Sequence, residues 1–285
     1  MVRGVETIMG LRRMTPQDLV AAHALSKQQK WPHRVEDWDM MLGLGFGYVL
    51  EQDGEVVSTA MAWRFGADAA AIGMVIVAPK VQGRGIGRRL MDALLADLGD
   101  RIVRLNATEA GLPLYRKLGF VECGSILQHQ GAAFSVPMAD LMADERVRPL
   151  GSKDMETLRS LTLRATGMNR DALLDALVVG SQGVVLTRDH DPVGFSLFRR
   201  FGRGYVVGPT IAPDIGGAKA LISHWLGSNS GIFCRIDVPQ ESGLAVWLDS
   251  LGLPCVGRVV RMVRGPTPPV DPTATVFSLT TQALG

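Results

Sequence analysis

The chain has 285 residues, of which 47% are hydrophobic, and this length accommodates two domains of ordinary size, each with its own core. The formal net charge is only +2, which argues against nucleic acid or an anionic membrane as the partner. The three cysteines form no CxxC pair and have no histidine cluster nearby, so neither a disulfide framework nor a structural metal site is expected. No apolar run approaches the roughly 20 residues that span a bilayer, and residues 1–10 lack the apolar stretch of a signal peptide. We therefore expect a soluble cytoplasmic protein.

The first half of the chain alternates strand and helix patterns in the way typical of an α/β fold with a mixed sheet covered by helices. Asp53-Gly54 between two alternating segments is a strong hairpin signal. In chain order the patterns predict a strand at 8–13, a helix from Pro16 through Leu25, hairpin strands at 48–52 and 55–63, a buried strand at 70–79, a helix at 84–98, a strand at 101–107, a helix at 109–118 and a last strand pair over 119–130.

The sequence repeats itself at one fixed offset. The segment LRRMTPQDL at 11–19 aligns with VRPLGSKDM at 147–155, and 48–66 aligns without a gap with 184–202 at the same offset. Two matches at one offset predict two copies of one fold. We place the domains at 1–142 and 143–285, with a Pro-rich stretch before a last strand-like TVFSL near the end.

The stretch that follows the buried strand carries glycine at every second position, at Gly83, Gly85 and Gly87. It leads into a helix with an apolar stripe, so backbone N–H groups and the positive end of a helix dipole face an open concavity. Such an arrangement is typical of an anion site, here for a pyrophosphate. The arginines at 84, 88 and 89 would add charge at its rim.

Three other interpretations of this glycine loop compete with that one. A Walker loop needs Lys followed by Ser or Thr where Arg88 and Arg89 stand. A dinucleotide fingerprint needs a third glycine where Leu90 stands, and an acidic residue where Asn106 closes the next strand. A loop that only turns the chain is the structural alternative.

The pattern Gln82-x-x-Gly85-x-Gly87 after a V-x-P strand end, followed by LYRKLGF at 114–120, resembles the acetyl-CoA motif of the GCN5-related N-acetyltransferase (GNAT) superfamily. The resemblance covers about residues 8–131, and the whole chain is similar to the tandem form, in which an active copy precedes a diverged one. It implies two GNAT-like domains, each with a mixed, mostly antiparallel sheet, a splayed parallel strand pair and flanking helices.

The resemblance also implies acetyl-CoA as cosubstrate and no metal. The pantetheine arm would pair with one strand and the pyrophosphate would sit on 82–88. Thr108 stands where the family often has Asn. The implied cofactor-binding residues are Val75, Ile76, Val77, Gln82, Gly83, Arg84, Gly85, Ile86, Gly87, Arg88 and Thr108.

The family mechanism is direct attack of a neutral primary amine on the thioester carbonyl, in which the protein holds two substrates in line. Tyr115 of the LYRKLGF motif would protonate the departing sulfur; the alternative for this residue is a core aromatic. A thiol with a pKa of about 8.5 leaves readily, so acid assistance is expected to help rather than to be essential.

The general base is not identified by the sequence. The strand before the glycine loop lacks the usual acidic residue, and Asp68, His33, Glu36 and Glu109 are other candidates. A water chain is a further route for the proton.

The segment 27–47 stands where the family has its variable acceptor-binding region. Trp31, His33 and Trp38 would wall an amine pocket by stacking or cation–π contacts. The alternative is that the two tryptophans form the hydrophobic side of one helix.

The second copy has lost the glycine loop and the tyrosine. DIGGAKALISHW at 214–225 replaces the loop, and Trp247 and Leu248 stand opposite Tyr115. We expect this copy to pack on the first, to cover part of the acceptor cleft or to contribute specificity. Its candidates for facing a ligand are Arg199, Arg200, Asp237 and Trp247.

The sequence thus predicts an N-acetyltransferase that moves an acetyl group from acetyl-CoA to a primary amine of a small molecule in a ternary complex. The alternative is an acyl-CoA-binding sensor or partner-binding module with little catalysis. The retained Tyr115 favours catalysis, and no oligomeric state is indicated.

Overall fold

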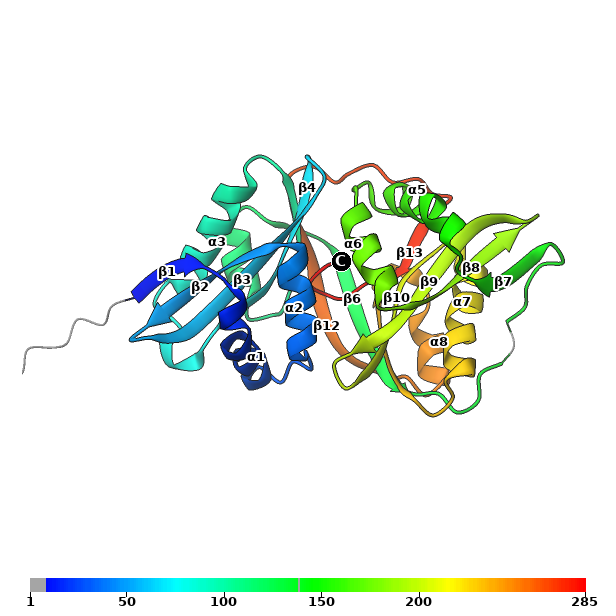
Figure 1. Ribbon diagram of the computed structural model, residues 1–285, viewed down its shortest axis with the longest axis horizontal. Helices are drawn as coiled ribbons and strands as arrows, with labels where there is room; N and C mark the ends of the chain where they lie inside the picture. The colour runs from blue at the N-terminus through cyan, green and yellow to red at the C-terminus, as the bar shows by residue number, and fades with distance from the viewer. Residues whose placement is uncertain (1–8, 138) are drawn as a thin grey trace, which may run out of the picture.

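Two lobes of the same design lie side by side in the computed structural model, which describes residues 9–137 and 139–285 (Figure 1). Both halves of the chain run in the same order: a strand, a short 3-10 turn, two helices, three antiparallel strands, a helix, a strand, a helix and a strand. This repetition confirms the predicted fold class. Residues 1–8, which include the start of the predicted first strand and most of the segment judged not to be a signal peptide, lie outside the described residues.

The elements of the first half are β1 (Met9–Arg13), η1 (Pro16–Asp18), α1 (Leu19–Gln28), α2 (Val35–Leu44), β2 (Phe46–Gln52), β3 (Glu55–Phe65), β4 (Ala69–Val77), η2 (Pro79–Val81), α3 (Ile86–Leu98), β5 (Ile102–Ala107), α4 (Leu112–Lys117) and β6 (Val121–Ala132). Those of the second half are β7 (Glu145–Pro149), η3 (Ser152–Asp154), α5 (Met155–Thr166), α6 (Asp171–Val179), β8 (Gln182–Arg188), β9 (Asp191–Phe201), β10 (Gly204–Ala212), α7 (Ile215–Ser228), β11 (Phe233–Pro239), η4 (Gln240–Ser242), α8 (Ala245–Ser250), β12 (Cys255–Arg264) and β13 (Thr275–Ser278).

Local sequence signals explain the elements that position the site. Asp53 and Gly54 both have positive φ, +53° and +83°, as a tight hairpin turn between β2 and β3 requires. Helix α3 begins at Ile86, two residues later than predicted, because Gly85 is left-handed at φ +75°. The predicted stripe of α3 is confirmed, since Ile86, Leu90, Leu94 and Leu98 are buried.

The two lobes share one continuous sheet because β6 of the first half and β12 of the second half each pair with a strand of the other half. The strand order is β1-β2-β3-β4-β5-β12-β6-β11-β10-β9-β8-β7, with β13 paired to β10. Figure 1 shows β6 and β12 crossing together between the lobes. The predicted strand pair over 119–130 is therefore wrong: this segment is the single strand β6, and its neighbours β11 and β12 come from the second half.

Strands β4 and β5 separate after a short parallel contact. They pair only from Ala69↔Ile102 to Ala71↔Arg104. Beyond that point β4 contains a bulge, at which Met74 has a φ of +53°, and it pairs only with β3. One backbone edge of β4, from Gly73 to Val77, is thus left open towards the cleft between the strands.

The corresponding notch of the second half is filled by the chain itself. Strands β10 and β11 pair only at Tyr205↔Cys234 and Val206↔Arg235. Past this contact β13 pairs antiparallel with β10 at 210–212, and the amide of Leu279 donates to the Asp237 carbonyl of β11 at 2.8 Å. The β13 strand therefore occupies the place that stays open between β4 and β5.

The larger hydrophobic core extends across both lobes. It contains Trp38 and Met41 of α2 together with Leu173, Leu174 and Leu177 of α6. Apolar packing thus adds to the shared sheet in fixing the lobes against each other. None of the helices in residues 9–137 and 139–285 is both long and apolar enough to cross a membrane.

Candidate functional site

The glycine loop leaves a run of backbone amides without partners. In the described part of the chain, the N–H groups of residues 83–88 find no acceptor, and no side chain caps the N-terminus of α3. Gly83 and Gly85 have φ of +78° and +75°, and a Cβ on either would meet nothing within 4 Å. The loop thus presents donors and the positive end of α3 to open space.

Charged and polar side chains surround the loop. Gln82 donates from Nε2 to the Val77 carbonyl at 3.0 Å and so ties the loop to the end of β4. Arg84, Arg88 and Arg89 are exposed, and Arg88 pairs with Asp92 one turn along α3. Ile86 points into the core, so only its backbone faces the loop's concavity.

The open edge of β4 connects this loop to the interior of the molecule. Val75 and Val77 are half-buried, whereas the Ile76 side chain is buried in the core. Because β5 has diverged, the backbone of these residues can pair with an extended ligand as it would with a strand. The three predicted strand residues and the glycine loop therefore form one continuous path.

A cavity of about 260 Å³ lies at the inner end of this path. It is walled by the bulge of β4 (Gly73, Met74, Val75), by Thr108 and Tyr115, and by residues of the second half that include Phe201, Arg235 and Arg258. The sequence-predicted residues Trp31 and His33 also line it. The structure thus brings both halves of the chain to one site.

Tyr115 is buried within this site with 8% of its surface exposed. Burial raises the pKa of its hydroxyl to about 12, so the phenol stays protonated at neutral pH. Among the described residues no side chain hydrogen-bonds this hydroxyl. Thr108 lies exposed at the rim of the same cavity, and its carbonyl accepts from the Gly111 amide at the start of α4.

His33 is neutral in this environment. Burial, reinforced by the charge of Arg235, lowers the pKa of its imidazole to about 4. Its Nδ1 is buried and has no hydrogen-bond partner among the described residues. The ring packs edge-on to Phe201 at 5.3 Å between centroids and is 5.9 Å from the ring of Trp31.

The third predicted acceptor residue, Trp38, is not part of the cavity wall. It is fully buried in α2, and its Nε1 donates to Ser26 Oγ at 3.2 Å. Trp31 precedes α2, which begins at Val35, so the two tryptophans do not share one helix face either. Of the four candidate bases, Asp68, Glu36 and Glu109 are exposed outside the cavity, and only His33 lines it.

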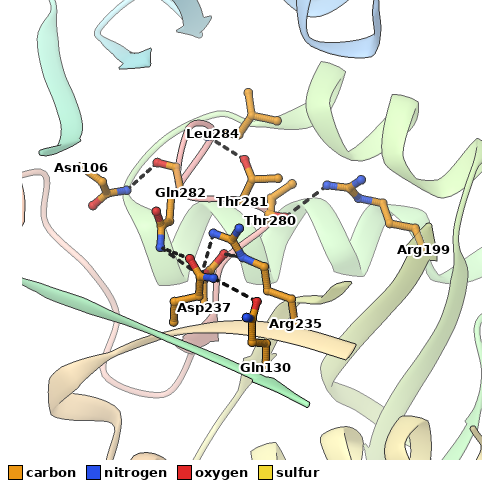
Figure 2. A network of polar contacts seen from close by, with 10 residues as sticks. Asn106, Gln130, Arg199, Arg235, Asp237, Thr280, Thr281, Gln282 and Leu284 are labelled. Carbon is orange, nitrogen blue, oxygen red and sulfur yellow. Dashed lines mark hydrogen bonds and ion pairs between the residues drawn. The ribbon is translucent and has the colours of Figure 1, made fainter. Parts of the chain in front are cut away.

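A polar network from the second half and the chain's last residues closes the cavity (Figure 2). Arg235 and Asp237 on β11 form a buried ion pair at 2.9 Å. Gln282 donates from Nε2 to Asp237 Oδ1 at 3.1 Å, and its carbonyl accepts from Asn106 Nδ2 at 2.7 Å. Arg199 donates to the Thr280 carbonyl at 3.2 Å. The segment 279–285, which we call the tail, is thereby fixed between the lobes.

Sequence reasoning named Arg199 and Asp237 of this network but missed the tail. Thr281, Gln282 and Ala283 all line the cavity, and a Cβ on Gly73 would lie 3.0 Å from the Ala283 Cβ. The only sequence signal was the strand-like TVFSL after the Pro-rich stretch, which leads into the tail. The other two candidates lie elsewhere: Arg200 stacks on Tyr205, and Trp247 faces Lys219 on α7.

The wall of the cavity carries more basic than acidic side chains. Lys30, Arg235 and Arg258 line it, and no Asp or Glu of the described chain does, but the charge of Arg235 is balanced by its ion pair with Asp237. No group of three or more His, Cys, Asp or Glu residues in 9–137 and 139–285 is placed to hold a metal ion.

In the second half, the segment equivalent to the glycine loop finds its hydrogen-bond partners within the chain. Asp214 caps α7, with its Oδ1 accepting from the Gly217 amide at 2.8 Å, and Arg188 pairs with the same carboxylate at 3.3 Å. A carboxylate of the chain thus stands at the N-terminus of α7, where the first half has unpaired amides.

Comparison with known proteins gives the family. The GNAT acetyltransferase domain family matches residues 44–122 and again residues 158–278. The uncharacterized N-acetyltransferase YitH of Bacillus subtilis (strain 168) is 31% identical over 223 residues, which cover 76% of this chain and 77% of YitH. The holothin acyltransferase of Pseudoalteromonas sp. (strain SANK 73390) is 26% identical over 251 residues, 82% of each chain.

A solved structure shows the same fold over the full length. The crystal structure of an acetyltransferase candidate from Pyrococcus horikoshii matches with a TM-score of 0.79 at 19% identity, covering 100% of both chains. The chain belongs to the GNAT acetyltransferase family and carries two GNAT domains in tandem. Enzymes of this family in general use acetyl-CoA.

Proposed function

We propose that the protein transfers an acetyl group from acetyl-CoA to the primary amine of a small molecule that also carries an anionic group. The observation that supports this most strongly is the unpaired run of amides at 83–88 beside the open edge of β4. In this proposal the first half, within residues 1–142, is catalytic, and the half within 143–285 contributes the far wall of the acceptor site.

The donor set fits acetyl-CoA. The amides and glycines of the loop suit a diphosphate, since no Cβ intrudes and the α3 dipole favours negative charge. Arg84 and Arg88 add charge at the rim, and the backbone of Val75, Ile76 and Val77 suits an extended amide-containing arm. When bound, the cosubstrate supplies an acetyl group activated as a thioester.

Two side chains of the cavity take part in hydrogen bonding and proton transfer in this proposal. Tyr115 keeps its proton because burial raises its pKa, so its hydroxyl can donate to a departing sulfur. His33 stays neutral because burial lowers its pKa, so its imidazole keeps a nitrogen lone pair that can accept a hydrogen bond from the acceptor amine. Lys30 and Arg258, which have no carboxylate partner among the described residues, lower the pKa of a nearby ammonium group and so favour the neutral nucleophile.

The same cations indicate the acceptor class. A cavity of about 260 Å³ with basic residues and no acid in its wall disfavours polyamines and suits a small amine with a carboxylate or similar anion. One relative, the holothin acyltransferase, is named for a single compound, holothin.

The second half is not expected to bind acetyl-CoA. Asp214 stands at the N-terminus of α7, and β13 fills the notch between β10 and β11. A carboxylate at the phosphate position repels the ligand, and a paired strand edge offers it no hydrogen bonds.

Calorimetric titration with acetyl-CoA tests the assignment. Gly85→Glu is expected to reduce the affinity at least about 100-fold, because a carboxylate would occupy the diphosphate position. The matched control is Gly54→Glu, which also introduces glutamate at positive φ with open space around the Cβ, but in the distant hairpin. Equal affinities of the two variants would refute the loop assignment.

Release of CoA thiol, measured against a panel of amines, tests the chemistry. We expect turnover with amines that carry a carboxylate and little with the matched decarboxylated amines. Tight binding of acetyl-CoA without turnover on any amine would instead indicate a sensor.

A further inference from the structure

A second and larger cavity, of about 630 Å³, lies on the other side of the tail. Asn106 and Ala283 contribute to the walls of both cavities and thus lie between them. The rest of the wall includes residues of α5 and α6, of β5, β10, β12 and β13, and of the Pro-rich segment 265–272. It does not include the glycine loop, Tyr115 or His33, and so the proposed reaction makes no use of it.

One end of this cavity is strongly basic. Arg261 on β12 is paired in register with Asn106 on β5, and Arg104 stands two residues before Asn106, so both arginines share one face of the sheet. In the described part of the chain Arg104 has no hydrogen bond or ion pair from its side chain, although it is half-buried. Burial, and after it the charge of Arg261, lowers the pKa of Arg104.

The carboxylates nearby balance only part of this charge. Glu241 is 3.6 Å from Arg261, and its side chain is 61% exposed. Asp271, at the edge of the cavity, is paired with Arg164. The third arginine of the wall, Arg170, is already engaged, because its guanidinium donates to the main-chain oxygens of Leu284 and Gly285 at 3.0 and 2.8 Å.

Much of the remaining wall is apolar. Its apolar residues come from helices α5 and α6, strand β10 and the Pro-rich segment: Ala165, Leu173, Leu174, Leu177, Ile211 and Val270. A volume of about 630 Å³ lies within the range typical of small-molecule sites, roughly 300–1,000 Å³. Two arginines on one sheet face and aliphatic side chains from α5 and α6 suit an amphipathic anion.

We propose that this cavity binds an aliphatic monocarboxylate, with the carboxylate between Arg104 and Arg261 and the hydrocarbon chain against α5 and α6. A guanidinium without a partner matches a carboxylate in planar, two-pronged geometry. A single negative charge suffices because Glu241 already balances part of the charge of Arg261. The ligand would bind to the full chain independently of acetyl-CoA.

Titration calorimetry with octanoate tests the site. The wild-type protein is expected to bind one octanoate per chain, and Arg104→Gln and Arg261→Gln are each expected to weaken this binding at least about tenfold. Arg258→Gln is the matched control, because Arg258 lies on the same strand but lines the first cavity. Its octanoate affinity should equal that of the wild type.

Further variants and ligands define the chemistry of the site and control for loss of the fold. Arg104→Lys keeps the charge, so it is expected to bind octanoate with an affinity between those of the wild type and Arg104→Gln. Acetate and octylamine, which lack the chain and the negative charge respectively, should bind at least about tenfold more weakly than octanoate, and inorganic phosphate should not compete.

Three results would overturn the proposal. The first is unchanged octanoate affinity in the Arg104 and Arg261 variants. The second is loss of affinity in Arg258→Gln or competition by saturating acetyl-CoA, since either would place octanoate in the first cavity. The third is tighter binding of octylamine or phosphate than of octanoate.

Discussion

Tyr115 and His33 show how burial alone sets protonation in the candidate site. The phenol has its pKa raised to about 12 and the imidazole has its pKa lowered to about 4, in both cases chiefly because water is excluded. Both side chains are therefore uncharged at neutral pH. One is a hydrogen-bond donor and the other offers an acceptor to the same cavity.

Replacing the phenol tests its role as proton donor. Tyr115→Phe is expected to lower kcat about 100-fold with little change in the KM for acetyl-CoA, because the ring and its packing remain. The wild-type kcat should show no decline with rising pH up to about pH 10, since a pKa of about 12 keeps the proton on Tyr115. Steady-state kinetics between pH 6 and 10 measure both.

The control for this replacement is Tyr48→Phe, which removes a hydroxyl that donates to Asp97 at 2.7 Å in the distant β2. Its kcat should match the wild type. A wild-type rate for Tyr115→Phe would show that Tyr115 is not the acid.

His33 makes stability depend on pH in a defined window. Above pH 6.5 the imidazole is neutral in both the folded and the unfolded chain and contributes nothing. As the pH falls from about 6.5 to about 4, the unfolded chain takes up a proton that the folded state excludes, so the free energy of unfolding decreases. Below that window the loss is complete.

His33→Gln is therefore expected to lose less stability than the wild type when the pH is lowered through this window. Urea unfolding of both proteins at pH 7.5, 5.5 and 4.5 measures the difference, in which the other titrating groups cancel. If the free energy of unfolding of both proteins decreased equally with falling pH, the assignment of His33 as a buried, neutral histidine would be contradicted.

At the scale of the elements, the tail joins the two cavities and completes the acceptor site. Gln282 holds three partners at once, Asn106, Asp237 and Gln128. Its backbone carbonyl and its side-chain amide are both used, so the position of the tail depends on this residue. The tail belongs to the second half in sequence but to the first half's cavity in space.

Gln282→Ala is expected to raise the KM for the acceptor at least about fivefold, because the tail loses the side-chain hydrogen bonds to Asp237 and Gln128, together worth at least about 1 kcal/mol. The KM for acetyl-CoA should not change, since the glycine loop is not touched. The control is Gln130→Ala, a glutamine of the same network that does not line the cavity. An unchanged acceptor KM would remove the tail from the binding site.

For the whole molecule, the exchange of β6 and β12 makes the halves interdependent. Strand β12 pairs with β5 of the first half, and β6 pairs with β11 of the second. Neither half alone can complete its sheet, and each would expose an unpaired strand edge.

The full chain is therefore expected to unfold in one cooperative transition. Differential scanning calorimetry should give a calorimetric enthalpy equal to the van't Hoff enthalpy. Two resolved transitions would show that the halves unfold independently despite the shared strands.

The local elements were largely predictable from the sequence because their signals are local. The Asp53-Gly54 turn, the stripe of α3 and the glycine loop depend on residues within a few positions of one another. The predictions that concerned Trp38 and the strand pair over 119–130 failed for the opposite reason. Whether a tryptophan lines a cavity or enters the core, and which strand lies beside β6, depends on residues far away in the chain.

The sequence by itself determined the repeated α/β pattern, the family resemblance and the glycine loop, because each of these is written in short-range spacing. Only the tertiary structure decided that β6 and β12 are exchanged, that β13 fills the space between β10 and β11, and that the tail lines the acceptor cavity. These features arise because a strand pairs with an open strand edge that lies near it in space. The periodicity of a sequence indicates that a segment is a strand, but it does not identify the neighbouring strand.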